Sequence, residues 1–266
     1  MTTTLLVLQH VEREGPDLIT DLAQQRGMTI QILRVDQGAP LPDPNRCDNT
    51  IALVLGGPMA VKDRQTPGME WLQQELEWLT IWHQQRKPVL GICLGAQLLA
   101  IAAGGSVGSL HAGKPPMPFK EVGFSNIDWR FPPEAEPWLK VCSSSNLAVH
   151  WHGDRIHLPA TATLLGSSLA CAEQVFRIEQ HALGLQCHWE VSMGNLERWI
   201  QEDHDFVVDA LGKHGPRLLR NDAHRCGVGV EQFGQLFLEN AIDQLNLAVQ
   251  NVEQLIYKVP RDSSHY

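Results

Sequence analysis

The sequence predicts an α/β protein with a doubly wound, mostly parallel but mixed sheet, helices on both faces and extra C-terminal helices. Short apolar runs of β type alternate with helical patterns through the first hundred residues, which is typical of parallel strands joined by helices. From residue 104 to 186 the pattern changes to short extended pieces separated by Pro and Gly, which favours antiparallel strands added to the same sheet. From residue 192 onward much of the apolar spacing is helical.

The elements of the alternating part follow from their apolar spacing and from the turn residues between them. In chain order, strands are expected at residues 5–8, 29–35, 51–55 and 89–92, and helices at 17–26 and 69–86. The second of these helices carries Trp71, Trp78 and Trp82 at offsets of seven and four, hence on roughly one face. We expect this stripe to face the core.

The remaining elements are shorter or less regular. Extended pieces are expected at 121–129, 163–167, 174–179 and 182–187, and helices at 192–210 and 231–256. The segment 213–229 contains Gly-Pro, Asn-Asp and two further glycines, and we interpret it as a connector of unknown role. Residues 1–200 are expected to form the main domain and residues 201–266 a helical extension packed on it. The last helix is expected to cover the core, and a partner or dimer surface is the alternative.

Composition limits the classes of partner. The 266 residues are 43% apolar and 19% charged, as in an ordinary globular protein with a sizeable core. A formal charge of -9 argues against nucleic acid or an anionic membrane as the main partner. The longest apolar stretch, residues 89–103, is too short and too interrupted to span a membrane, and no signal peptide is recognisable. Small molecules or proteins are better candidates as partners, and we expect a small-molecule substrate. Six scattered cysteines indicate free thiols in a reducing compartment, so we expect a cytoplasmic location.

Cys93 carries the clearest chemical signal. It follows the strand at 89–92 and precedes a helical pattern, in the sequence Gly91-Ile92-Cys93-Leu94-Gly95. A nucleophile between two glycines at such a turn is held in a strained backbone conformation above the sheet. The helix N-terminus beside it favours thiolate over thiol, and a thiolate attacks carbonyl carbons. We predict that Cys93 is a catalytic nucleophile rather than a buried structural cysteine.

A thiolate that cleaves an amide also needs an acid to protonate the departing nitrogen. Among the 12 histidines, His188 is distinguished because it follows the extended piece at 182–187 and precedes Glu190 by two residues. Residues two apart at a strand end can point to one side, so the carboxylate could orient the imidazole. We predict His188 as general base and acid and Glu190 as its orienting partner. A structural surface pair is the alternative.

An oxyanion intermediate needs preorganised donors, and backbone amides in glycine turns supply them. Gly56-Gly57-Pro58 follows the strand at 51–55 and opens on the same sheet edge as Cys93, where ligands of such folds bind. We therefore predict that the amides of Gly57 and Leu94 form the oxyanion hole. An ordinary strand-end turn is the alternative.

Three segments together, at residues 56–58, 91–97 and 184–190, resemble the class I glutamine amidotransferases. The resemblance covers about residues 4 to 200 and implies a flavodoxin-like glutaminase domain. In that family the cysteine forms a γ-glutamyl thioester, ammonia is released and water then frees glutamate. The resemblance also implies that Gln97 helps to hold the amino-acid head of the substrate.

The segment His150-Trp151-His152-Gly153-Asp154 is similar to the Ser-His-Gly-Asp segment of glutaminase domains related to GMP synthase. Trp151 stands where serine is common. The resemblance implies that backbone groups of Trp151 and His152 contact the substrate. A competing interpretation is a metal pair of His150 and His152 with Asp154, for which no further ligand suggests itself.

Two departures from the family pattern bear on function. Trp189 replaces the usual proline between His188 and Glu190, and nothing in the chain resembles an ATP-binding synthetase domain. The resemblance implies hydrolysis of a γ-glutamyl amide bond, either of glutamine for a possible separate synthetase subunit or of a γ-glutamyl conjugate, as in γ-glutamyl peptidases. A glutaminase that is silent until its partner docks, and a non-catalytic regulatory or binding subunit, are further alternatives. We expect no cofactor and no metal.

Overall fold

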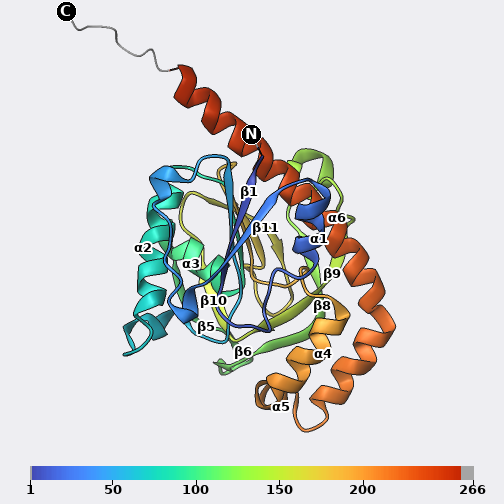
Figure 1. Ribbon diagram of the computed structural model, residues 1–266. Coiled ribbons are helices and arrows are strands. Elements are labelled where there is room, and N and C mark those ends of the chain that lie inside the picture. Colours follow the sequence, from blue (N-terminus) through green and yellow to red (C-terminus); the bar gives the residue numbers. More distant parts are fainter. Residues whose placement is uncertain (1, 259–266) are drawn as a thin grey trace, which may run out of the picture.

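A nine-stranded mixed sheet lies at the centre of the protein (Figure 1). The computed structural model describes residues 2–258, with side chains through residue 249. The strands of this sheet are β1 (Thr4–Gln9), β2 (Thr29–Arg34), β3 (Thr50–Val54), β4 (Val89–Ile92), β8 (Glu121–Trp129), β9 (Ser145–His152), β11 (Ala162–Ser167), β12 (Val175–Ile178) and β13 (Ala182–Leu185). Two small ladders join β5 (Ser106–Ser109) to β10 (Asp154–His157) and β6 (His111–Ala112) to β7 (Met117–Pro118).

The order of the strands across the sheet is β2-β1-β3-β4-β13-β12-β11-β8-β9. Neighbours from β2 to β13 pair in parallel. Neighbours from β13 to β9 pair antiparallel. The first five strands therefore form the flavodoxin-like part, and ligands of such sheets bind beyond the carboxyl ends of the strands. The predicted fold class is confirmed.

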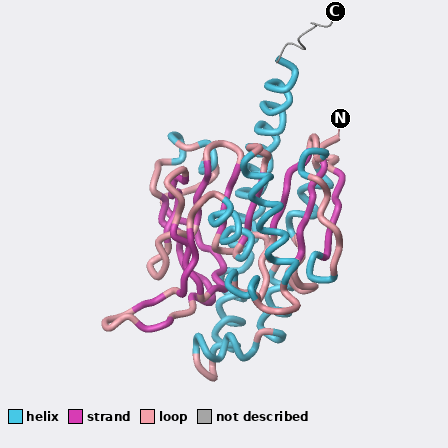
Figure 2. The backbone as a smooth tube through the Cα atoms, turned by 90° about the vertical axis from the view of Figure 1, so that its left-hand side faces the viewer, coloured by secondary structure: helices cyan, strands magenta, loops and turns pink. Residues whose placement is uncertain are grey.

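Helices cover both faces of the sheet (Figures 1 and 2). They are α1 (Leu18–Gln25), α2 (Glu70–Gln84), α3 (Leu94–Ala102), α4 (Met193–Glu202), α5 (His204–Leu211) and α6 (Gly215–Lys258), with short 3-10 turns at Val35–Gln37, Pro44–Arg46, Val61–Gln65, Pro133–Ala135 and Pro137–Leu139. Leu5 and Val7 of β1 pack into the core cluster on the side of α1 and α6. Leu6 and Leu8 pack into the cluster on the side of α2 and α3. Alternate residues of a buried strand thus supply two cores.

The tryptophan stripe of α2 behaves largely as predicted. Trp78 and Trp82 are buried in the core and stack with ring centroids 4.7 Å apart. Trp71 is half-buried, and its ring stacks on His10 at 5.7 Å. The stripe therefore runs from the core to the turn after β1.

The predicted connector at 213–229 is wrong, because α6 begins at Gly215 and continues through this segment. Pro216 falls in the first helical turn, where its missing N–H costs no hydrogen bond. Gly227 lies against Met193, whose Sδ would be 2.5 Å from an added Cβ. Tertiary packing thus overrides the turn-forming composition.

The described part of α6 covers the core, as predicted. Its buried side chains belong to the same cluster as the strands, and they include Phe237, Leu238, Ala241, Ile242 and Leu245. The helix also contacts α1, α4, α5, β8 and β9. Among the described residues, no helix combines the length and the apolar character needed to cross a membrane.

Candidate active site

Cys93 stands between β4 and α3 with strained backbone angles, φ 50° and ψ -107°. The flanking glycines are sterically required. A Cβ on Gly91 would lie 2.6 Å from the carbonyl oxygen of Gly95, and a Cβ on Gly95 would lie 2.0 Å from the carbonyl oxygen of Val54. The turn thus has the geometry that the sequence predicted for a nucleophile elbow.

His188 and Glu190 form a buried pair next to this turn. His188 Nδ1 lies 2.6 Å from Glu190 Oε1, while His188 Nε2 has no hydrogen-bond partner among the described residues. Burial lowers the pKa of His188, but the charge of Glu190 and its hydrogen bond, together with the neighbouring Cys93, outweigh burial and raise this pKa well above 6.5. Glu190 therefore favours the protonated form of the imidazole, and Nε2 is the ring nitrogen that has no partner among the described residues.

Gln186 is a residue of this site that the sequence analysis missed. Its Nε2 donates to Cys93 Sγ at 3.5 Å, and its Oε1 accepts from Gln97 Nε2 at 3.1 Å. Gln97 thus reaches the thiol through Gln186. The signal that could have found Gln186 is its position two residues before His188, since alternate residues of an extended segment share a side.

His10 and Glu75 fix the segment that follows β3. The sequence analysis also missed these two residues. His10 Nδ1 donates to the carbonyl oxygen of Gly56 at 2.9 Å, and Nε2 lies 2.9 Å from Glu75. Burial lowers the pKa of His10, but Glu75 outweighs it and the pKa is raised. The carbonyl of Gly56 and the N–H of Gly57 belong to one planar trans peptide and point in opposite directions. Fixing the carbonyl on His10 therefore aims the Gly57 N–H away from His10.

Glu14 is a third unpredicted neighbour of the elbow. A Cβ added to Gly56 would lie 2.5 Å from Glu14 Oε2 and 3.5 Å from both Cys93 Cβ and His188 Cε1. Burial raises the pKa of Glu14 to about 7, helped by Asp203 and Glu190 and opposed by His188 and Arg13. A carboxyl group that titrates near neutral pH thus lies beside the predicted catalytic side chains.

Trp151 and His152, the predicted substrate-binding residues of β9, make different contacts. The carbonyl oxygen of Trp151 lies 4.0 Å from Cys93 Sγ. The side chain of His152 instead turns toward Glu121, 3.2 Å from its Oε2. Trp151 Nε1 donates to Asp203 at 3.1 Å. The backbone of Trp151, and not the imidazole of His152, therefore borders the thiol.

Trp189, which replaces the usual proline, points into the core beneath α6. Its ring lies 4.6 Å from the ring of Phe237 and 5.4 Å from that of Phe233. Its Nε1 donates to the carbonyl oxygen of Leu147 at 2.9 Å. The substitution therefore attaches the His188–Glu190 segment to the C-terminal helix.

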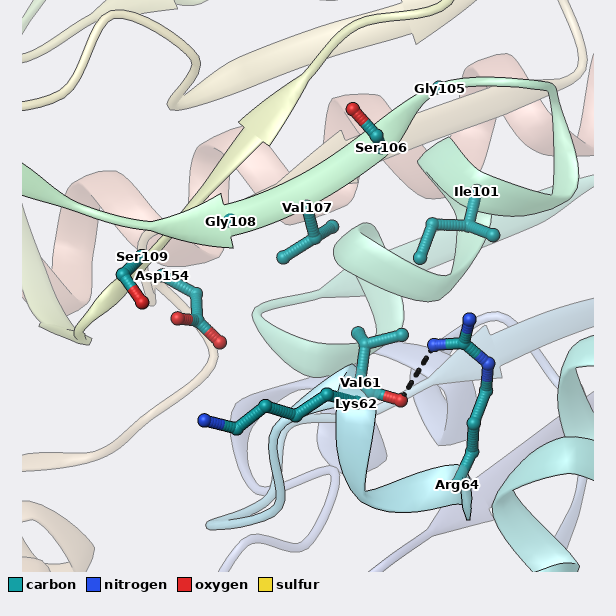
Figure 3. Close-up of a pocket in the computed structure, with 10 residues that line it drawn as sticks. All are labelled: Val61, Lys62, Arg64, Ile101, Gly105, Ser106, Val107, Gly108, Ser109 and Asp154. Atoms are coloured by element: carbon teal, nitrogen blue, oxygen red, sulfur yellow. Dashed lines mark hydrogen bonds between the residues drawn. The ribbon is translucent and has the colours of Figure 1, made fainter.

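A pocket of about 360 Å³ lies away from these side chains, between the turn at Val61–Gln65, α3 and β5 (Figure 3). Lys62, Arg64 and Asp154 contribute its charged groups, and no residue predicted for catalysis lines it. Asp154 therefore faces this pocket rather than the two histidines of β9.

The fold and these contacts define an α/β protein with a cysteine at a strand-to-helix elbow beside a buried His–Glu pair. The family model of the class I glutamine amidotransferases matches residues 17–205, and the chain belongs to this family. It is 30% identical to the glutamine amidotransferase-like protein YfeJ of Salmonella typhimurium over 90% of this chain and 95% of that protein. The predicted family membership is confirmed.

Two further similarities support this membership. The chain is 28% identical to γ-glutamyl peptidase 3 of Arabidopsis thaliana over 62% of this chain and 64% of that protein. The crystal structure of a glutamine amidotransferase from Thermotoga maritima superposes with a TM-score of 0.78 at 25% identity, over 92% of this chain and 99% of that one.

Proposed function

We propose that the protein hydrolyses γ-glutamyl amide bonds through a thioester on Cys93. The observation that carries the proposal is the strained elbow of Cys93 beside His188, whose Nδ1 lies 2.6 Å from Glu190. Membership of the class I glutamine amidotransferases supports the same chemistry.

In the first half of the reaction, Cys93 Sγ attacks the γ-carbonyl carbon and an S–C bond forms. The N–H groups of Gly57 and Leu94 stabilise the oxyanion. His188 then gives its Nε2 proton to the nitrogen as the C–N bond breaks, and ammonia or an amine leaves.

In the second half, His188 removes a proton from water, and the resulting hydroxide attacks the thioester. The C–S bond breaks and glutamate leaves, with the thiolate restored. Glu190 keeps the imidazole in one orientation in both halves. No cofactor takes part in these steps.

The substrate's amino-acid head is proposed to bind Gln97 and the backbone around Trp151 and His152. The Trp151 carbonyl 4.0 Å from the thiol supports the backbone contribution. The link from Gln97 through Gln186 to Cys93 favours Gln97 as a group that also fixes Gln186.

Two substrates are candidates, because glutamine and γ-glutamyl conjugates present the same γ-glutamyl group to Cys93 and differ only beyond the scissile nitrogen. Glutamine would deliver ammonia, for use by a separate synthetase subunit. The similarity to a γ-glutamyl peptidase favours γ-glutamyl peptides or other conjugates as the second candidate. The domain division at residue 200 and the cytoplasmic location remain predictions.

The experiment compares release of glutamate from glutamine and from a panel of γ-glutamyl dipeptides, with Cys93→Ala as the inactive control. We expect turnover of at least one substrate by the wild type and none by the variant. A glutamine-analogue electrophile should label wild-type Cys93 only. The absence of both turnover and labelling would reject the enzyme proposal in favour of a binding subunit. Activity that appears only with an added synthetase would identify the partner-dependent form.

A further inference from the structure

Three buried side chains outside the proposed catalytic steps converge on one point: Glu121, His150 and His152. Glu121 of β8 stands directly opposite His152 of β9, and His150 lies two residues earlier on β9. Alternation along the strand therefore brings all three to one face of the ladder. One nitrogen or oxygen atom from each lies within 4.8 Å of those from the other two.

Both histidines turn their second ring nitrogen toward Glu121. His152 Nδ1 lies 2.9 Å from the backbone oxygen of Asp154, and His150 Nε2 lies 3.3 Å from that of Ser125. A carbonyl oxygen only accepts hydrogen bonds, so these two nitrogens carry the protons. The opposite nitrogen of each ring, His152 Nε2 and His150 Nδ1, is directed at the cluster and offers a lone pair when the ring is neutral.

The contacts of the cluster leave one of these nitrogens without a donor. His150 Nδ1 is buried and has no hydrogen-bond partner among the described residues. Glu121 accepts hydrogen bonds from Gln174 Nε2 at 2.7 Å and from Ser125 Oγ at 3.3 Å. Its oxygens lie 3.2 Å from His152 Nε2 and 3.6 Å from His150 Nδ1. A buried ring nitrogen that faces a carboxylate with no donor between them marks a place that a cation would fill.

We propose that Glu121, His150 and His152 bind one divalent transition-metal ion of the zinc type. Two imidazoles and one carboxylate are a donor set that zinc favours, whereas calcium and magnesium prefer oxygen ligands. Ligands of tetrahedral zinc are about 3.3 Å apart when each bond is about 2.0 Å. The backbone carbonyls behind both rings are the outer partners that orient metal-binding histidines.

Gln174 offers a fourth ligand. Its Nε2 lies 2.7 Å from Glu121 Oε2 and 3.2 Å from His152 Nε2, and its Oε1 has no partner among the described residues. Rotating the amide by half a turn exchanges the two atoms and directs Oε1 at the ion. The ion would tie β8 to β9 next to Trp151, whose carbonyl borders Cys93. The role of the ion is therefore structural. Its carboxylate ligand is Glu121, and not Asp154 as in the alternative from the sequence.

The test measures metal in the purified full-length protein. Because the site is buried, the metal enters during folding. We therefore refold the chain with Zn²⁺ or Co²⁺, remove loose metal by gel filtration in a chelator, and determine the stoichiometry. The wild type should retain about one equivalent and melt at a higher temperature than metal-free protein, since a ligand that binds only the folded state stabilises it. The Co²⁺ form should show the visible absorption bands of a tetrahedral site.

Glu121→Gln is the informative variant, since its amide can donate to His152 Nε2 and satisfy the cluster without an ion. It should fold and lose at least about 100-fold in metal affinity. His157→Gln, which removes an exposed histidine of β10, is the matched control and should retain the ion. A wild type without bound metal, or equal retention by wild type and Glu121→Gln, would overturn the proposal. A wild type without metal would mean that a proton, and not an ion, lies between His152 and Glu121. Equal retention by the two proteins would mean that the metal binds adventitiously.

Discussion

At the scale of single residues, Glu14 couples the stability of the protein to pH. Burial raises its pKa to about 7 from an ordinary value of 4.5. Between these pH values the folded protein holds a proton that the unfolded chain has lost, so stability falls as the pH rises. The upper limit of this loss is about 3 kcal/mol, because one pKa unit corresponds to about 1.4 kcal/mol.

Glu14→Gln removes this titration. We expect the variant to gain stability relative to the wild type as the pH rises from 4.5 to about 7.5, by up to about 3 kcal/mol. Urea unfolding at several pH values measures the gain. Glu12→Gln, an exposed neighbour, should leave the pH dependence unchanged. Parallel pH curves for the wild type and Glu14→Gln would contradict the assignment.

His10 and Glu75 position the Gly56–Gly57 peptide from the side of α2. Glu75→Gln removes the charge that holds His10 protonated, and so loosens the donor that fixes the Gly56 carbonyl. We expect kcat to fall by about 10-fold to 100-fold, with KM changed by less than about 2-fold, because in the proposed mechanism the Gly57 N–H acts on the oxyanion and not on the bound substrate. Steady-state kinetics on the preferred substrate measure both constants.

Glu77→Gln is the matched control for Glu75→Gln, since Glu77 lies on the exposed side of α2 and contacts Gln73. It should leave kcat unchanged. A rise in KM with kcat preserved in Glu75→Gln would instead place the effect on ground-state binding.

At the scale of elements, α6 supports the strand end that carries His188 and Glu190. A Cβ on Gly234 would lie 2.5 Å from the carbonyl oxygen of Trp189, whereas a Cβ on Gly229 would meet nothing within 4 Å. The helix can approach this segment closely only because residue 234 has no side chain.

Gly234→Ala should therefore destabilise the protein by about 1 to 3 kcal/mol through overpacking. The same substitution at Gly229 should stabilise it by up to about 1 kcal/mol, because alanine favours the helix and the space is open. Thermal unfolding of the two variants makes the comparison. Activity should fall in Gly234→Ala alone, since Trp189 lies between the two proposed catalytic side chains. Equal shifts of the melting temperature in the two variants would show that close packing of α6 against Trp189 is not important for stability.

At the scale of the whole molecule, the C-terminal helix and the sheet share one core. Burial of Phe237, Leu238, Ile242 and Leu245 contributes about 1.5 to 3 kcal/mol per side chain. Together these four side chains contribute about as much as the total stability of a typical domain, about 5 to 15 kcal/mol. We expect a chain that ends at residue 214 to lose its near-UV circular dichroism and its cooperative unfolding. Cooperative folding of residues 1–214 alone would show instead that the extension is dispensable.

Much of the fold could be predicted because local pattern and tertiary environment agree in the parallel part of the sheet. Inner strands there, such as β3 and β4, are buried on both faces, and continuous apolar runs therefore mark them. β9 was not anticipated as a strand, because its segment Ser145–His152 mixes polar and apolar residues. The buried side chains of His150 and His152 lie against Glu121 of β8, a contact with a distant segment that the local pattern does not record.

The sequence by itself determined the α/β class and the residues around Cys93, because glycines flanking a cysteine between a strand and a helix leave one backbone geometry available. The pairing of His188 with Glu190 could also be predicted, since the two residues lie two positions apart on one extended segment. Only the tertiary structure brought Glu14, His10 with Glu75, and Gln186 to this site, and joined Glu121 to His150 and His152. The physical reason is that buried polar groups form hydrogen bonds with whichever segments the fold places beside them. Those segments are distant in the sequence, so the sequence pattern does not show the pairing.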